Sequence, residues 1–507
     1  MTGIEIGLFG FYGFILFLLV MFGFHKYYLL YLYWKFKNKP RHLPGKFEKL
    51  PRVTVQLPIF NEKYVVDRLI RSVCALDYPK DLLEIQLLDD SIDETQTVAQ
   101  NCVTRYQKQG HDIRYIHRKG REGFKAGALE YGLKTARGEF IAIFDADFVP
   151  NPLFLKETIP YFAHPNVGMV QTRWGHINRG YSLLTRIQSI FLDGHFIIEH
   201  TARNRSGKFF NFNGTAGIWR KETIKSAGGW QHDTLTEDLD LSYRAQLAGW
   251  DFVFLPDVVA PAELPVEMNA YKSQQHRWAK GSVQTAKKLL PQIFKSDIPF
   301  LVKLEASIHL ISNLTYLFMT IPSILMPIIL QLQLRRGWDW MVYLYLFVFF
   351  AATLSIICYY LIALKETQTS WKQQIPFIPL LMSLGIGLSI NNAKAVLEAL
   401  FNRTSDFKRT PKYRIETTHD KWRHKTYHTD FSFLPVLELM LGSYFTAALF
   451  SLLGEGLFVS VPFLILFQFG FVYIGIMSFL QSKPFRMNLR HVKLYFLNKL
   501  LLAGKRL

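Results

Sequence analysis

The stretch Phe140-Ile-Ala-Ile-Phe-Asp-Ala-Asp-Phe148 decides the fold, because a short apolar run ends in two carboxylates, Asp145 and Asp147. The first five residues predict a buried parallel strand. The two carboxylates then stand at its carboxyl end, where open α/β sheets bind ligands. Such close carboxylates repel each other, and their hard oxygen atoms favour Mg²⁺ or Mn²⁺ shared with a phosphate. For an isolated Asp-x-Asp, the alternative is a polar strand exit that caps a helix.

Strands and helices alternate upstream of this stretch. The apolar pattern predicts strands at 52–57, 84–88 and 113–117, helices at 63–76 and 93–110, and a further helix opening at Lys125. This alternation argues for a Rossmann-like parallel sheet. Three of its strands end in polar or acidic residues: Asn61 and Glu62, Asp89 and Asp90, Asp145 and Asp147. We therefore predict a binding crevice at one sheet edge, where Lys125 and nearby helix amides would suit a diphosphate.

Other nucleotide sites and cysteine-based sites are disfavoured. No Gly-x-Gly-x-x-Gly follows the first strand and no Walker lysine loop occurs, which argues against dinucleotide and P-loop sites. Cys74, Cys102 and Cys358 lack Cys-x-x-Cys spacing, so neither a zinc site nor a disulfide framework is predicted. A nucleoside diphosphate held by carboxylates and a metal fits this pattern better.

The hydrophobic residues gather at both ends of the 507-residue chain. Residues 1–35 predict a transmembrane anchor, since no cleavage site follows a short apolar core. Residues 36–300 have the charge and turn content of a water-facing domain. The region 301–480 returns to hydrophobic runs, which predict spans at about 304–333, 339–364, 432–453 and 457–480. We therefore expect a multi-pass membrane protein with one large water-facing domain.

The net charge of +19 does not indicate nucleic-acid binding, because the basic residues flank the hydrophobic segments. They fill the loop 401–430 and the tail 481–507, and the positive-inside rule places both, with the water-facing domain, in the cytoplasm. Residues 376–395 then cannot cross completely, so we expect a re-entrant or interfacial element there. This topology suits a bacterial inner-membrane protein.

Two helical stretches are candidates for the membrane surface. Residues 183–200 are amphipathic, and an ordinary core-facing helix is an equally good interpretation. Residues 271–290 end in Lys287 and Lys288 just before the membrane region, which favours the interfacial interpretation.

Four motifs occur in a specific order: Asp89-Asp90, Asp145-Ala-Asp147, Thr236-Glu-Asp238 and Gln274-Gln-His-Arg-Trp278. This set resembles the inverting family 2 glycosyltransferases of the cellulose and hyaluronan synthase type. The connecting text is most similar to plant cellulose-synthase-like mannan and xyloglucan-backbone synthases. The resemblance implies an α/β GT-A (Rossmann-like) cytosolic domain inserted between transmembrane α-helices.

The resemblance also implies roles for these residues. Glu62, Asp89 and Asp90 would hold the nucleoside, Asp145 would face the nucleotide and Asp147 would bind the metal. Asp238 would be the general base, and Glu237, Gln274, Arg277 and Trp278 would border the pyrophosphate and the acceptor sugar.

The chemistry of these side chains agrees with the implied roles. A carboxylate can take the proton of an attacking hydroxyl, and a divalent cation with Arg277 can stabilise the departing diphosphate. Taken alone, Asp238 reads as a helix N-terminal charge and Trp278 as a core or interfacial residue.

Residues 407–412 fall where the resembled synthases carry a gating loop over the active site. The match to that motif is partial, and a solvated basic loop beside the membrane is the competing interpretation.

We expect transfer of a hexose from UDP-glucose or GDP-mannose to a growing β-linked glycan, coupled to its export. A non-processive enzyme that makes a glycolipid is the first alternative, and a transporter or scaffold with an inactive nucleotide-sugar domain is the second. The expected partners are a nucleotide sugar, a glycan or lipid acceptor, the membrane and Mg²⁺ or Mn²⁺. A homodimer would supply more helices for a channel than one protomer has.

Overall fold

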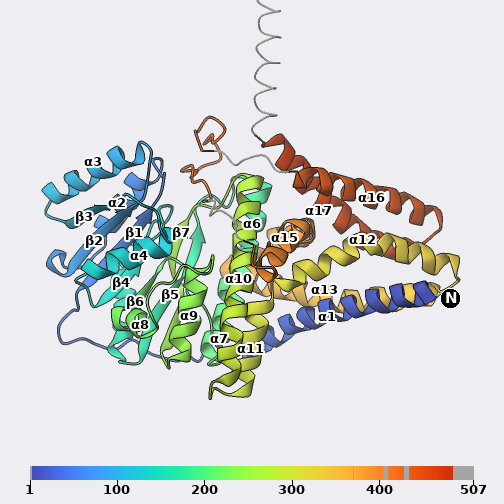
Figure 1. The fold of residues 1–507 in the computed structure, drawn as a ribbon, viewed down its shortest axis with the longest axis horizontal. Helices are drawn as coiled ribbons and strands as arrows, with labels where there is room; N and C mark the ends of the chain where they lie inside the picture. The colour runs from blue at the N-terminus through green and yellow to red at the C-terminus, as the bar shows by residue number, and fades with distance from the viewer. Residues whose placement is uncertain (1–2, 369, 404–408, 428–432, 483–507) are drawn as a thin grey trace, which may run out of the picture.

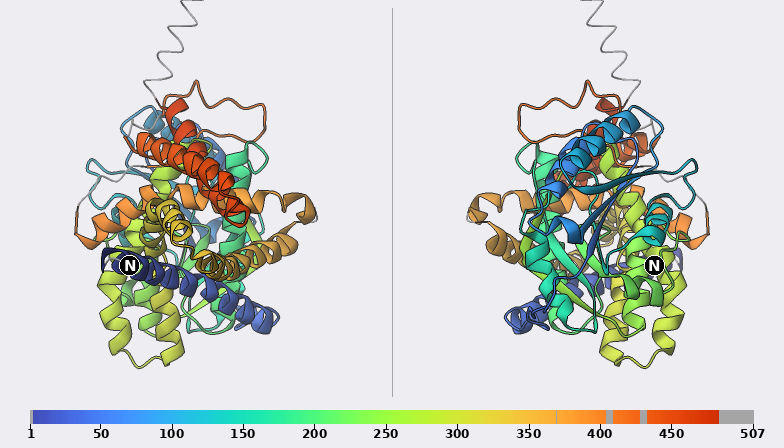
Figure 2. Two further views of the ribbon diagram at one scale, coloured as in Figure 1. Left: turned by 90° about the vertical axis from the view of Figure 1, so that its right-hand side faces the viewer. Right: turned by 90° about the vertical axis from the view of Figure 1, so that its left-hand side faces the viewer.

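A computed structural model describes residues 3–368, 370–403, 409–427 and 433–482. A sheet with its covering helices forms one end of the molecule, and a bundle of long helices forms the other (Figure 1). Figure 2 shows the molecule first from the bundle end and then from the sheet end. The expected tail 481–507 lies almost entirely outside the described residues, as do Phe407 and Lys408 of the expected gating motif.

One seven-stranded sheet has the strand order β3-β2-β1-β4-β6-β5-β7. The bounds are β1 (Val53–Ile59), β2 (Leu83–Asp89), β3 (Asp112–His117), β4 (Phe140–Ile143), β5 (Val167–His176), β6 (Gly217–Arg220) and β7 (Asp251–Ala262). The predicted parallel arrangement is confirmed for β1 to β4. It does not extend across the whole sheet, since β6 runs antiparallel to both β4 and β5. The sheet is therefore mixed.

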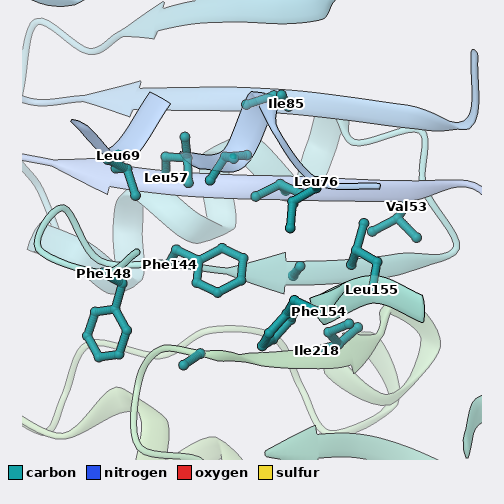
Figure 3. Packing of buried hydrophobic residues seen from close by; sticks show 14 of the residues in the cluster. Val53, Leu57, Leu69, Leu76, Ile85, Phe144, Phe148, Phe154, Leu155 and Ile218 are labelled. Atoms are coloured by element: carbon teal, nitrogen blue, oxygen red, sulfur yellow. The ribbon is translucent and has the colours of Figure 1, made fainter. Parts of the chain in front are cut away.

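Alternate residues of β4 belong to different cores on the two faces of the sheet. Phe140 and Ala142 join one buried cluster, and Ile141 and Ile143 join the other. Figure 3 shows the first cluster, in which Phe144 and Phe154 pack beneath the strands. Burial on both faces explains why the strand is apolar at every position. The chain becomes polar only at Asp145, where β4 has ended.

Helices follow most of the strands. They are α2 (Val66–Cys74), α3 (Thr95–Lys108), α4 (Phe124–Thr135), α5 (Phe154–Thr158), α6 (Leu183–Gly194), α7 (Thr201–Arg205), α8 (Lys221–Ser226) and α9 (Glu237–Leu247). A π-helical turn, η3 (His195–His200), joins α6 to α7. The domain ends in the long helix α10 (Met268–Lys295).

Five helices within the described residues are long and apolar enough to cross a membrane. They are α1 (Gly3–Phe36), α12 (Leu314–Arg335), α13 (Asp339–Thr367), α16 (Leu434–Gly454) and α17 (Val461–Leu480), the last preceded by a short turn. In Figure 1 they extend to one side of the sheet domain.

The segment expected to span at 304–333 is divided in the structure. Residues of α11 (Phe300–Ile311) form a separate helix, and α12 begins only at Leu314. The physical reason is that Glu305, which is 1% exposed, forms an ion pair with Arg203 of the sheet domain. A charge held there keeps α11 with that domain, and the helix that is long and apolar enough to span begins at Leu314. The expected start of the span at 304 stays a prediction.

The segment expected to be re-entrant forms α14 (Phe377–Gly387) and α15 (Ser389–Leu400). The two helices meet at a bend of 43°, which suits either a broken span or a re-entrant loop. A single straight crossing is not formed, and the re-entrant assignment stays a prediction.

Both candidate surface helices lie between the sheet and the bundle. In Figure 1, α6, α10 and α11 stand roughly upright, across the direction of the long helices. Residues of α6 pack with α13 and α14, and one of their shared clusters includes Leu184, Ile187 and Leu364. The contacts of α6 with α13 and α14 explain the amphipathic pattern of 183–200, and the interfacial assignment stays a prediction.

The loop that follows α15 returns to the sheet domain. Arg68 donates to Glu416 over 2.9 Å, and Tyr413 donates to Glu267 over 3.0 Å. We therefore expect a cysteine at exposed Thr417 to resist an impermeant thiol reagent in sealed cells, as the positive-inside rule predicts. A cysteine at exposed Glu455, between α16 and α17, is the matched control and should react. Labelling at Thr417 from outside would contradict the predicted topology.

Candidate active site

A cavity of about 190 Å³ lies at the carboxyl edge of β1, β2 and β4. Ten of the eleven residues predicted for the site line it: Glu62, Asp90, Lys125, Asp145, Asp147, Glu237, Asp238, Gln274, Arg277 and Trp278. Parallel strands that end at one edge bring their polar termini together, whatever their separation in the sequence. The cavity is therefore the candidate active site.

Asp89 is the exception among the predicted residues. Its side chain is fully buried, with one oxygen accepting from the Ser91 amide over 2.8 Å and the other from the Tyr115 hydroxyl over 2.7 Å. It is not among the residues that line the cavity, and a nucleotide contact at Asp89 stays a prediction. The carboxylate instead shapes the turn that presents Asp90.

Asp90 lines the cavity and forms an ion pair with Arg118. Arg118 Nε donates to Asp90 Oδ1 over 2.8 Å, and a second guanidinium nitrogen binds Oδ2. The same arginine donates to the Glu122 and Phe124 carbonyls at the start of α4. Two parallel donors hold the carboxylate in one orientation. Sequence reasoning missed Arg118, since a single arginine in a loop carries no motif.

Lys125 connects the Asp-Ala-Asp motif to the second half of the domain. Its ammonium donates to Asp145 Oδ1 over 2.5 Å and to the Gly214 carbonyl over 2.9 Å. Burial opposes the charge, but Asp145 and Glu237 outweigh it and raise the pKa of Lys125. A permanent cation in the first turn of α4 suits the diphosphate contact that the sequence predicted.

Two cations from the loop after α15 reach the acidic side of the cavity. Lys412 Nζ lies 2.6 Å from Asp147 Oδ2, and Arg409 lies 2.8 Å from Glu62 Oε1. Burial raises the pKa of Glu62 to about 7, with Asp147 and Asp145 adding to the rise and Arg409 opposing it. The sequence marked this loop through its partial gating motif, although it could not pair Lys412 with Asp147.

The donor set suits a divalent cation that is shared with a phosphate. Among the residues that the structure describes, no group of three or more His, Cys, Asp or Glu side chains forms a metal cage. Mg²⁺ commonly takes only one or two carboxylates and completes its shell with water and substrate phosphates. Asp145 and Asp147 both line the cavity and offer these oxygens, so the residues fit such an ion together with a diphosphate.

Asp238 lies in the first turn of α9, facing the cavity. Burial and the neighbouring Glu237 raise its pKa to about 7, against the opposing effects of Lys125 and two backbone amides. A β-carbon on Gly214 would lie 3.0 Å from Asp238 Oδ2, and Gly214 has φ +80°. The close approach of this backbone therefore depends on glycine. A carboxylate with such a pKa can exchange protons near neutrality.

Three residues of α10 complete the cavity wall. Gln274, Arg277 and Trp278 are spaced three and four residues apart, which places them on one face of the helix. Burial lowers the pKa of Arg277, although Glu237, Asp145 and Asp238 oppose the change. Trp278 also packs against the second core cluster, so the core interpretation and the cavity interpretation both apply to it.

Comparison with known proteins places residues 51–281 on a family model described as "Glycosyltransferase like family 2". Glucomannan 4-beta-mannosyltransferase 2 from Arabidopsis thaliana is 43% identical over 281 residues, covering 53% of this chain and 52% of the relative. A probable glucomannan 4-beta-mannosyltransferase 7 from Oryza sativa subsp. japonica is 44% identical over 282 residues, covering 53% and 48%. The chain thus spans about half the length of the curated relatives it matches.

A solved structure shares the fold. The mannosyltransferase from Pyrobaculum calidifontis, in complex with GDP-Man and Mn²⁺, has a TM-score of 0.52 at 19% identity, covering 77% of this chain and 99% of the other. At this identity the likeness concerns the fold alone.

Proposed function

We propose that the protein transfers a hexose from a nucleotide sugar to a β-linked glycan, because residues 51–281 match the family 2 glycosyltransferase model and the fold resembles that of a solved mannosyltransferase. We propose GDP-mannose as the donor over UDP-glucose, because the relatives at 43% and 44% identity are named as mannosyltransferases. The observation that carries the proposal is the placement of Asp238, Lys125 and Asp145 around one cavity.

The proposed reaction assigns one task to each side chain. Asp238 takes the proton of the acceptor hydroxyl as that oxygen attacks the anomeric carbon of the donor. Lys125 and Arg277 stabilise the negative charge that develops on the departing diphosphate. Asp147 and Asp145 would hold Mg²⁺ or Mn²⁺, which supplies further stabilisation of that charge when bound.

The acceptor side of the proposal rests on α10. Trp278 offers an aromatic face to a sugar ring, and Gln274 offers a hydrogen bond to its hydroxyls. Asp90, held by Arg118, and Glu62 would contact the nucleoside at the opposite end.

We extend the proposal to a membrane enzyme that exports its product from a cytoplasmic active site. Further buried polar side chains lie near Gln274, where α10 contacts α15 and α16. Lys272 Nζ lies 2.5 Å from Glu438 Oε1, both side chains being at most 5% exposed. Glu438 Oε2, Gln275 Nε2 and Ser389 Oγ are buried and form no hydrogen bond within the part of the chain that the structure describes. Polar atoms in this state suit a hydroxyl-rich chain, and a homodimer would add helices around it.

The transfer rate should rise as pH increases through about 7, because only the ionised carboxylate of Asp238 can accept a proton and its pKa is about 7. The measurement is kcat/KM over about two pH units on either side, at saturating metal. A rate that is flat over this range, or that falls with increasing pH, would argue against Asp238 as the base.

The deciding experiment is product analysis with the purified full chain in lipid vesicles. Each radiolabelled donor, GDP-mannose or UDP-glucose, is supplied in turn, and chloroform-soluble label is separated from high-molecular-weight label. We expect high-molecular-weight product from GDP-mannose. Label confined to a glycolipid would establish the non-processive alternative, and no transfer with either donor would support an inactive sugar-nucleotide-binding domain.

A further inference from the structure

Asn213 lies on the cavity wall between two histidines. Its Nδ2 donates to His195 Nε2 over 3.0 Å, and its Oδ1 accepts from His200 Nε2 over 2.6 Å. The residues on either side, Phe212 and Gly214, are buried, whereas Asn213 is half-buried. Its carboxamide is therefore fixed in orientation where it meets the cavity, and an amide has a second N–H and a second lone pair to offer.

The peptide at 213–214 touches both ends of the proposed reaction. The Gly214 carbonyl accepts from Lys125, which also binds Asp145 at the diphosphate end. A β-carbon on Gly214 would lie 3.0 Å from Asp238 at the base end. The anomeric carbon of the donor hexose bears the diphosphate and is also the carbon that the acceptor hydroxyl attacks, so the hexose must lie between these two ends. Asn213 is thus beside the place of the transferred sugar.

Glu199 determines which nitrogen of His195 carries the proton. His195 Nδ1 lies 3.3 Å from Glu199 Oε2. Burial opposes ionisation of Glu199, but Lys26 and Arg203 hold its pKa well below the usual range. An ionised carboxylate only accepts hydrogen bonds, so Nδ1 carries the hydrogen and Nε2 is left as the acceptor for Asn213. Burial also keeps the pKa of His200 well below its usual range, so His200 is neutral and donates through Nε2.

Ion pairs, partly buried at Lys26 and buried at Arg203 and Glu305, anchor this arrangement to helices outside the sheet domain. Lys26 of α1 lies 2.5 Å from Glu199 Oε1, and Arg203 lies 3.0 Å from Oε2. Arg203 also lies 2.9 Å from Glu305 of α11. Two cations therefore balance two carboxylates, which allows both acids to stay ionised while buried. The histidines belong to the π-helical turn η3, a geometry common at functional sites.

We propose that Asn213 contacts a hydroxyl of the donor hexose, and that His195, set by Glu199, is a positioning residue that orients the Asn213 carboxamide. This inference rests on the proposed function. It names a sugar contact that none of the four sequence motifs contains. It also predicts that the contact depends on His195, which is not among the residues that line the cavity.

The test measures donor binding and transfer with the full chain in lipid. Asn213→Ala should lower kcat/KM for GDP-mannose by about 10- to 100-fold, since hydrogen bonds to a sugar hydroxyl are lost. Its affinity for GDP alone should stay unchanged, because GDP lacks the hexose. His195→Leu should cause a similar loss, whereas His195→Gln, which keeps an acceptor near the position of Nε2, should recover activity to within about threefold of wild type.

A double mutant separates positioning from a general effect on folding. His195→Leu combined with Asn213→Ala should be no slower than Asn213→Ala alone, since the two residues act through one contact. His111→Leu, at the opposite end of the sheet domain, is the matched histidine control and should leave both measurements unchanged. Unaltered kcat/KM in Asn213→Ala, or losses that add in the double mutant, would overturn the inference. Absence of transfer by the wild type would instead overturn the proposed function.

Discussion

The variant Asp147→Asn is expected to abolish turnover while the protein still folds and binds lipid. Asp147 offers one of the two cavity carboxylates suited to a hard cation, and a neutral amide is a poor ligand for such an ion. We expect a loss of at least about 10³-fold in kcat, since the departing diphosphate would lose its strongest stabilising charge. Transfer assays at saturating Mg²⁺ and at saturating Mn²⁺ measure this effect.

The controls for Asp147→Asn address its second contact. The substitution also removes the ion pair with Lys412, so Lys412→Met should be assayed beside it. If the metal explains the loss, chelation should inactivate wild type and Lys412→Met alike. Asp112→Asn, at the other end of the sheet, is the matched acid control and should retain activity. Full wild-type activity in excess chelator would refute the metal assignment.

The variant Asp238→Asn should lower kcat by about 10²-fold or more and leave donor affinity near that of wild type. The amide has nearly the same shape as the carboxylate but cannot take a proton. Removal of the Asp238 carboxylate should also flatten the rise in transfer rate through pH 7, because that rise is assigned to the Asp238 pKa of about 7. Steady-state kinetics and GDP titration of the same preparation separate the two effects.

Two further results would count against Asp238 as the base. A loss that appears only in KM would make it a binding residue. A loss of GDP affinity equal to the loss of kcat would indicate a disturbed cavity, which the close contact with Gly214 makes a necessary control. Glu237 is the acid next to Asp238, and Glu237→Gln should lower kcat less than Asp238→Asn does. Glu237 is proposed to border the diphosphate and the acceptor, whereas Asp238 takes the proton.

The arrangement of Lys412 and Arg409 could not have been read from the sequence. Lys412 pairs with Asp147, which precedes it by 265 residues, and Arg409 pairs with Glu62, which precedes it by 347. The loop that carries them follows α15, and the packing of that helix against α10 and the contacts of the loop with Arg68 and Glu267 bring it to the cavity. Asp89 shows the reverse case, in which an acid in a binding motif is turned inward by Tyr115 and Ser91.

The sequence by itself determined the alternation of β1 to β4 and the acidic ends of three strands. These features are local, because strand periodicity and motif spacing follow from neighbouring residues. Tertiary structure alone decided the antiparallel direction of β6, the separation of α11 from α12 and the hydrogen bonds of His195 and His200 with Asn213. Each of these depends on contacts between distant segments, and the free energy of burying Glu199, Arg203 and Glu305 together is set by partners that no local pattern specifies.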